Sequence, residues 1–177
     1  MPRNVLHLRQ KPVCNMIRNA TPADVKAIVN IYNHYIAHST ATFEVDPVDE
    51  EEMHRRIAAF SVHCPYLVDE EEGTVAGYCY AHPWKERAAY RGTLETTVYV
   101  SPAFQRQGIG RRLMLRLISE CRQRGYHTLV ACITGGNQAS YDLHRSLGFH
   151  QVSCFEKVGE KFGQRLDVVD WQLTLVP

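Results

Sequence analysis

The chain has 177 residues, a formal net charge of +1, 45% hydrophobic residues and 22% charged residues, which is enough for one well-buried core and too little for two. This charge balance creates no broad field of one sign, so it argues against nucleic acid or an anionic membrane surface as a partner. The six cysteines form no C-x-x-C pair, which argues against a zinc knuckle or a thioredoxin-like site and favours a reducing compartment.

The N-terminal segment "MPRNVLHLRQKPVCN", residues 1–15, shows no clear periodicity. It lacks the apolar core and the small-residue cleavage site of a signal peptide, and no apolar run in the chain approaches the ~20 residues that a membrane span needs. We therefore predict a disordered tail over residues 1–15, a single domain over residues 16–177 and a cytoplasmic location.

The first half of the domain changes from helical to strand periodicity. A short strand is predicted at "NMIRNA", residues 15–20, followed by a helix that starts at Thr21-Pro22 and continues through apolar residues at helical spacing. A second helix follows the acidic segment Glu50 to Glu52, which suits the positive end of a helix. The run "YLVDEEEGTVAGYCYAHPW" then predicts a hairpin that turns at Gly73.

The second half alternates strands and helices. The strand "GTLETTVYV" is ended by Pro102. The later predicted elements are a helix from Gly108 to Arg124, the strand "HTLVACIT", the helix "NQASYDLHRSLG", and strands over Gln151 to Val158 and Asp167 to Val176. The order β-α-α-β-β-β-α-β-α-β-β predicts an α/β (α+β) fold in which a mixed sheet carries helices on both faces.

The junction "LETTVYVSPAFQRQGIGRRLM" connects a β-branched strand to an amphipathic helix through two glycines. The start of a helix presents unpaired N–H groups and a positive partial charge, and Gly108 and Gly110 have no Cβ atoms to obstruct an anion there. Arg106, Arg111 and Arg112 add positive charge, so a pyrophosphate suits this position. The alternative interpretation is a tight strand-to-helix turn with solvated arginines. The spacing matches neither a Walker loop nor a dinucleotide fingerprint.

The segment "VYVSPAFQRQGIGRRLM" resembles the acyl-CoA-binding motif Q/R-x-x-G-x-G/A of the GCN5-related N-acetyltransferase (GNAT) superfamily, with Gln105, Gly108 and Gly110 at its fixed positions. The segments "NHYIAHSTATFE", "AHPWKERAAY", "LETTVYV" and "LHRSLGF" resemble the phosphinothricin and methionine sulfoximine N-acetyltransferase branch. The resemblance covers roughly Met16 to Leu175. It implies a GNAT fold with a mostly antiparallel sheet of about seven strands, splayed between strands four and five, and an N-acetyltransferase domain over residues 16–177.

The same resemblance implies acetyl-CoA as co-substrate, a small-molecule amine as acceptor, a homodimer and no metal. The pantetheine arm is expected along the fourth strand, the pyrophosphate at the glycine turn, and further contacts from the helix after "GG". The implied cofactor-binding residues are Val98, Tyr99, Val100, Arg106, Gln107, Gly108, Ile109, Gly110, Arg111, Asn137 and Ser140. Asn137 is also well suited to be only an N-cap, and the two roles are compatible.

Acetyl transfer to an amine requires removal of a proton from the ammonium group and allows protonation of the leaving thiolate. Strand alternation places Glu95 on the opposite side from Leu94 and Thr96, and the resemblance implies that Glu95 is the general base. A solvated face of an edge strand is the alternative for this carboxylate. His144 matches the position that protonates the thiolate, although an isolated helix histidine is more often core or surface filler; Tyr141, one turn earlier, could substitute for it.

The acceptor is expected to be a small amino acid analogue that carries an anion. The resemblance implies that Phe43 lines the acceptor pocket and that Arg87 and Tyr90 hold the acidic group, because an arginine fork suits a carboxylate or phosphinate. Exposed loop charge is the ordinary alternative for Arg87. The chain departs from the family's "G-x-W" at Arg165 and Leu166, which leaves the exact acceptor open.

The predicted function is transfer of an acetyl group from acetyl-CoA to the primary amine of a phosphinothricin, methionine sulfoximine or methionine sulfone type of acceptor. One alternative is an antibiotic, a polyamine or a protein N-terminus as the acceptor. The other is an acyl-CoA-binding module without turnover, against which the two proton-handling groups Glu95 and His144 argue.

Overall fold

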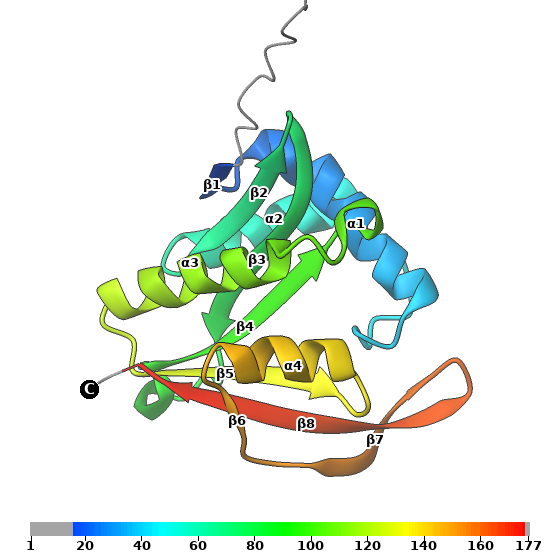
Figure 1. The fold of residues 1–177 in the computed structure, drawn as a ribbon, viewed down its shortest axis with the longest axis vertical. Coiled ribbons are helices and arrows are strands. Elements are labelled where there is room, and N and C mark those ends of the chain that lie inside the picture. Colours follow the sequence, from blue (N-terminus) through cyan, green and yellow to red (C-terminus); the bar gives the residue numbers. More distant parts are fainter. Residues whose placement is uncertain (1–15, 176–177) are drawn as a thin grey trace, which may run out of the picture.

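Eight strands form one sheet in the computed structural model, which describes residues 16–175 (Figure 1). The tail predicted over residues 1–15 lies outside the described residues. The strand order is β1-β2-β3-β4-β5-β8-β6, with β7 paired to β8. The strands are β1 (Met16–Asn19), β2 (Tyr66–Glu71), β3 (Thr74–Pro83), β4 (Thr93–Val100), β5 (Thr128–Thr134), β6 (His150–Gln151), β7 (Phe155–Lys161) and β8 (Gln164–Thr174).

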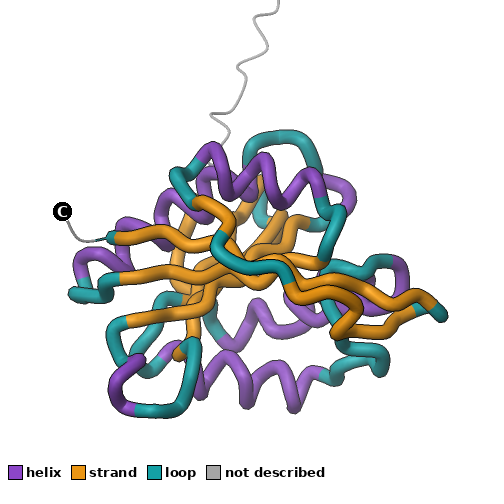
Figure 2. Tube along the Cα trace, turned by 90° about the horizontal axis from the view of Figure 1, so that it is seen from below, coloured by secondary structure: helices purple, strands orange, loops and turns teal. Residues whose placement is uncertain are grey.

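Helices cover both faces of the sheet, as predicted (Figure 2). They are α1 (Val25–His38), α2 (Glu50–Ser61), α3 (Ile109–Gln123) and α4 (Gln138–Ser146). The apolar residues of α1 and α2 pack in one core cluster, and those of α3 pack in a second cluster on the other face, with α4 against it. Within the described part of the chain, no helix is long and apolar enough to cross a membrane.

The sheet opens between its fourth and fifth strands, as the family resemblance implies. All neighbouring strands are antiparallel except β4 and β5, which pair in parallel over three positions only, ending at Glu95 opposite Val130. Beyond that pair, β4 continues to Val100 and β5 to Thr134, and the two strands diverge (Figure 1). The β5-facing edge of β4 therefore has no strand partner from Thr96 onward within the described sheet.

The C-terminal strands differ from the prediction in one respect. The single strand predicted over residues 151–158 is divided into β6 and β7, which raises the number of strands from about seven to eight. The amides of Val152 and Ser153 both donate to the carbonyl oxygen of Asp170, at 2.9 and 3.4 Å. Two successive amides that share one acceptor interrupt the ladder, as in a β-bulge. The last strand also begins earlier than predicted, at Gln164 rather than Asp167.

Candidate active site

A cleft of about 810 Å³ opens where β4 and β5 diverge. Its walls come from the two diverging strands, the C-terminal part of α1 with the loop that follows it, the start of α3, and α4. Ten of the eleven predicted cofactor-binding residues line this cleft; the exception is Gln107. Glu95, His144 and Phe43 line it as well. The structure thus brings together residues that are up to about a hundred positions apart in the chain.

The glycine turn places the start of α3 at one end of the cleft. Gly108 is the N-cap of α3 and has φ of +78°, a left-handed conformation that favours glycine. The first hydrogen bond of the helix runs from the Arg112 amide to the Gly108 carbonyl at 3.1 Å. The amides of Ile109, Gly110 and Arg111 therefore precede the helical ladder and stay available to an anion.

The two glycines serve different purposes. A Cβ atom on Gly108 would meet nothing within 4 Å, so the requirement for glycine there is conformational. A Cβ atom on Gly110 would lie 3.5 Å from side-chain carbons of Leu143 and Val100, an ordinary packing distance.

The arginines at this turn are not equivalent. Arg106 and Arg111 line the cleft. Arg112 instead forms ion pairs with Asp69, which is fully buried, and with Glu71, both on β2. Successive helix residues point about 100° apart, which directs Arg111 and Arg112 to different sides of α3. The structure therefore corrects the prediction for Arg112, whose charge is paired with β2 and does not belong to the positive cluster at this turn.

The open edge of β4 is held by two polar side chains that sequence reasoning did not single out for this purpose. The hydroxyl of Tyr35, on α1, donates to the carbonyl oxygen of Val100 at 2.7 Å. The side-chain amide of Gln105 donates to the same hydroxyl at 3.4 Å. These contacts connect α1, the end of β4 and the glycine turn at the mouth of the cleft, so the strand edge remains fixed although it has no strand partner.

The start of α4 forms the opposite wall. Asn137 is its N-cap, and its side-chain oxygen accepts a hydrogen bond from the Ser140 amide at 3.2 Å. His144 lies one turn after Ser140 and is 4% exposed. Its Nδ1 lies 2.8 Å from the Ser140 carbonyl oxygen. A carbonyl oxygen can only accept, so Nδ1 carries the hydrogen and Nε2 holds the lone pair.

Burial lowers the pKa of His144, because the charged imidazolium loses its solvation there; the Ser140 carbonyl offsets this only in part. The alternative acid, Tyr141, does not line the cleft. Its hydroxyl accepts a hydrogen bond from the Gly136 amide at 3.0 Å, and its ring stacks on Trp171 with the centroids 5.4 Å apart. The structure therefore separates the two candidates, since only His144 lies in the cleft.

Glu95 occupies the last paired position of β4, at the point of divergence. Its side chain is 26% exposed and lies on the face that carries Tyr99 and the α1–α2 core, as alternation predicted. On the opposite face, the hydroxyl of Thr96 donates to the carbonyl oxygen of Val130 at 3.3 Å. A carboxylate held here is half-buried within the cleft, which differs from the solvated edge-strand alternative.

The loop after α1 carries Phe43, which lines the cleft. The Phe43 ring lies against Gly159 of β7 so closely that a Cβ atom on Gly159 would collide with it. The ammonium group of Lys161, at the end of β7, donates to the carbonyl oxygens of Ser39 and Thr42, both at 2.8 Å. Lys161 is 3% exposed, and burial lowers its pKa. No pattern in the sequence indicated this contact.

Arg87 and Tyr90 lie outside the lining of the cleft. Arg87 is exposed and precedes the short 3₁₀ turn Ala88–Tyr90. The Tyr90 ring packs edge-on against Trp84, with the centroids 5.3 Å apart. The Arg165 and Leu166 departure falls within β8 rather than before it. The assignment of Arg87 and Tyr90 to the acceptor thus remains a prediction.

Known proteins are similar to this chain in both sequence and architecture. Residues 28–149 match the family model described as Acetyltransferase (GNAT) family. An L-methionine sulfoximine/L-methionine sulfone acetyltransferase of Salmonella typhimurium strain LT2 is 42% identical over 163 residues, which span 90% of this chain and 94% of that protein. A phosphinothricin N-acetyltransferase of Alcaligenes faecalis is 41% identical over 161 residues, which span 90% of this chain and 82% of that protein.

A solved structure of a GNAT superfamily phosphinothricin acetyltransferase from Sinorhizobium meliloti, in complex with acetyl-CoA, superposes with a TM-score of 0.89 at 35% identity. The match covers 91% of this chain and 88% of that chain. The predicted GNAT fold and the predicted similarity to phosphinothricin and methionine sulfoximine acetyltransferases are both confirmed. The chain belongs to the Acetyltransferase (GNAT) family and is an N-acetyltransferase.

Proposed function

We propose that this enzyme transfers an acetyl group from acetyl-CoA to the primary amine of small amino acid analogues of the phosphinothricin and methionine sulfoximine type. The observation that carries the proposal is the position of Glu95, which lies where β4 and β5 diverge and in the same cleft as the N-terminus of α3. A proton acceptor and an anion-binding turn thus share one cavity. The activities of the two relatives named above support the choice of acceptor.

The cleft fits acetyl-CoA at both of its chemically distinct parts. The open edge of β4 at Val98 to Val100 has no strand partner and offers backbone groups to the amides of the pantetheine arm, although the Val100 carbonyl oxygen already accepts from Tyr35. The amides at the start of α3, with Arg106 and Arg111, suit the pyrophosphate. When bound, acetyl-CoA supplies the acetyl group as a thioester. Asn137 and Ser140 line the wall opposite and complete the predicted contacts.

Glu95 is the proposed general base. The acceptor arrives as an ammonium ion, and its nitrogen has a free lone pair only after one proton has left. Among the described residues that line the cleft, Glu95 is the only one with a carboxylate, and its side chain is partly shielded from water. It can therefore receive that proton directly or through one water molecule. Positioning of the amine next to this carboxylate supplies the orientation that the reaction needs.

His144 is the proposed carrier of the second amine proton to the departing thiol. Its Nδ1–H is occupied by the Ser140 carbonyl, so Nε2 is the nitrogen that exchanges protons. A lowered pKa makes the imidazolium form a stronger acid, which releases its proton readily to a thiolate. Because the resting imidazole is neutral, Nε2 can accept the second amine proton before it passes that proton to the thiolate.

The acceptor side remains a proposal in its details. Phe43 lines the cleft and supplies an apolar wall, whereas Arg87 and Tyr90 lie outside it in the single chain. We retain the homodimer and the role of these two residues as predictions. Sedimentation velocity across a range of protein concentrations tests the dimer, and a monomer at every concentration would contradict it.

The experiment that tests the function measures thiol release from acetyl-CoA against a panel of amines. The panel holds phosphinothricin, methionine sulfoximine, methionine sulfone, ordinary amino acids, polyamines and short peptides. We expect turnover with the first three. Turnover confined to polyamines or peptides would overturn the acceptor class, and acetyl-CoA binding without turnover on any amine would favour the non-catalytic module.

A further inference from the structure

His82 on β3 lies directly across from Glu95 on β4. The two residues are register partners in the antiparallel β3–β4 ladder, and both line the cleft. His82 Nε2 is 3.8 Å from Glu95 Oε1, and the two side chains are 24% and 26% exposed. Among the ion pairs of the described residues, this is the only one that involves Glu95.

The orientation of the His82 ring is fixed from two sides. Its Nδ1 lies 3.1 Å from the carbonyl oxygen of Pro83, and because a carbonyl only accepts, Nδ1 carries a hydrogen. The ring stacks on Phe60 of α2 with the centroids 5.2 Å apart and an interplanar angle of 25°. Nε2 is therefore the nitrogen that faces the carboxylate, and its protonation is the variable part of the pair.

Of the titratable groups near Glu95, His82 is the one that can accept a proton from its carboxylate. Tyr80, on the same strand as His82, has its pKa raised, mainly by burial, and so does the Cys132 thiol on β5. Asp170 on β8 pairs across the sheet with Cys132 and adds negative charge beyond it. Tyr80 and Cys132 therefore keep their protons at neutral pH, and neither can take one from Glu95.

We propose that His82 is a positioning residue that orients Glu95 and receives, at Nε2, the proton that Glu95 removes from the acceptor ammonium. This inference rests on the proposed role of Glu95 as the base. The ammonium gives one proton to the Glu95 carboxylate, which passes it to Nε2, and the imidazolium releases it to solvent. The C–N bond forms, the C–S bond breaks, and the second amine proton leaves on the thiol, so the products are the amide, the free thiol and one proton.

The geometry imposes a pH dependence. When Nε2 is already protonated, His82 forms an ion pair with Glu95 and cannot accept another proton, so kcat/KM for the amine falls as pH decreases. The acidic limb of the pH profile should therefore depend on the presence of His82 beside Glu95.

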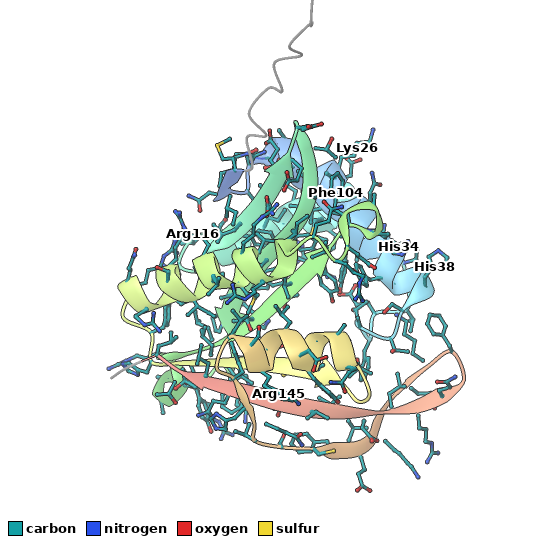
Figure 3. All side chains as sticks on the ribbon, viewed as in Figure 1. Lys26, His34, His38, Phe104, Arg116 and Arg145 are labelled. Atoms are coloured by element: carbon teal, nitrogen blue, oxygen red, sulfur yellow. The ribbon has the colours of Figure 1, made fainter. Side chains whose placement is uncertain are left out.

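The test compares wild type with His82→Gln, which retains a neutral polar group without a titratable nitrogen, and with His82→Asn as a second variant. His34→Gln is the matched control, because His34 is exposed and points outward from α1 (Figure 3). We expect His82→Gln to lower kcat/KM for the amine about tenfold at pH 7.5, less than the roughly 10²–10⁴-fold that a general base itself contributes, because Glu95 remains in place. We also expect its acidic limb to move to lower pH by about one unit or more, with the acetyl-CoA KM unchanged.

A purely structural role for His82 predicts lower activity with the acidic limb in its original place, and that result would overturn the inference. An unchanged kcat/KM in both variants would also overturn it. Glu95→Gln separates this inference from the proposed function. A strong loss of kcat in Glu95→Gln together with wild-type behaviour of His82→Gln overturns the role of His82 alone, whereas full activity of Glu95→Gln removes Glu95 as the base.

Discussion

The imidazole of His144 donates from Nδ1 to the carbonyl oxygen of Ser140, one turn earlier in α4, across 2.8 Å. This contact fixes the tautomer and leaves the buried ring neutral, because burial lowers its pKa. The same side chain lines the cleft, so its protonation affects both the stability of the fold and the chemistry.

Stability should therefore depend on pH through His144. Unfolding returns its pKa to the ordinary value of 6.5, so below that pH the unfolded chain binds a proton that the folded chain resists. We expect the free energy of unfolding to fall as pH decreases from about 6.5 toward the lower pKa that His144 has in the folded chain. Urea unfolding at pH 7.5 and pH 5 should show a smaller difference for His144→Gln than for wild type. The exposed His34→Gln variant should keep the wild-type difference. The same difference in unfolding free energy between the two pH values in all three proteins would contradict the prediction.

Gly108 and Gly125 form a matched pair at the two ends of α3. Both have positive φ, +78° and +81°, and a Cβ atom on either would meet nothing within 4 Å. Alanine at either position should cost about 1 kcal/mol or more of stability, because an L-residue rarely adopts this conformation. Only Gly108→Ala should also raise the acetyl-CoA KM, since only Gly108 shapes the anion-binding turn. Steady-state kinetics with thermal unfolding as a control would show this, and equal KM values in both variants would remove the turn from cofactor binding.

Arg87→Ala should raise the KM for phosphinothricin and methionine sulfoximine with little effect on the acetyl-CoA KM. The physical reason is the loss of a guanidinium fork for the acidic group of the acceptor. Arg87 is exposed and lies outside the cleft of one chain, so the measurement is informative in either direction. Arg116→Ala, an exposed arginine on α3, is the control (Figure 3). An unchanged acceptor KM in Arg87→Ala would exclude this side chain from the acceptor site.

The parts of the site that could be predicted from the sequence depend on short-range signals. The glycine turn and α3 are encoded within about twenty consecutive residues, and alternation along one strand places Glu95 on the correct face. Asn137 and His144 lie on one short helix, where a spacing of seven residues brings side chains to the same face.

The parts that could not be predicted depend on pairings between distant segments. Arg112 binds carboxylates more than forty positions earlier, and without the β2–α3 packing its charge could not be distinguished from that of Arg111. The partnership of His82 with Glu95 follows from the β3–β4 register, and a shift by one residue would have placed the histidine on the other face. The division of the strand over residues 151–158 reflects one shared acceptor on β8.

Lys161 provides the last prediction, because its two hydrogen bonds attach the β7–β8 hairpin to the loop that carries Phe43. Removal of the ammonium group leaves two loop carbonyls without their donor, and the loop then loses the position from which Phe43 lines the cleft. We expect Lys161→Met to raise the acceptor KM several-fold while the acetyl-CoA KM stays within about twofold, because the glycine turn lies at the other end of the cleft. Lys26→Met, on the exposed face of α1, is the control for loss of a lysine charge (Figure 3). Parallel increases in both KM values would indicate general disruption of the fold, and an unchanged acceptor KM would show that the loop holds its position without Lys161.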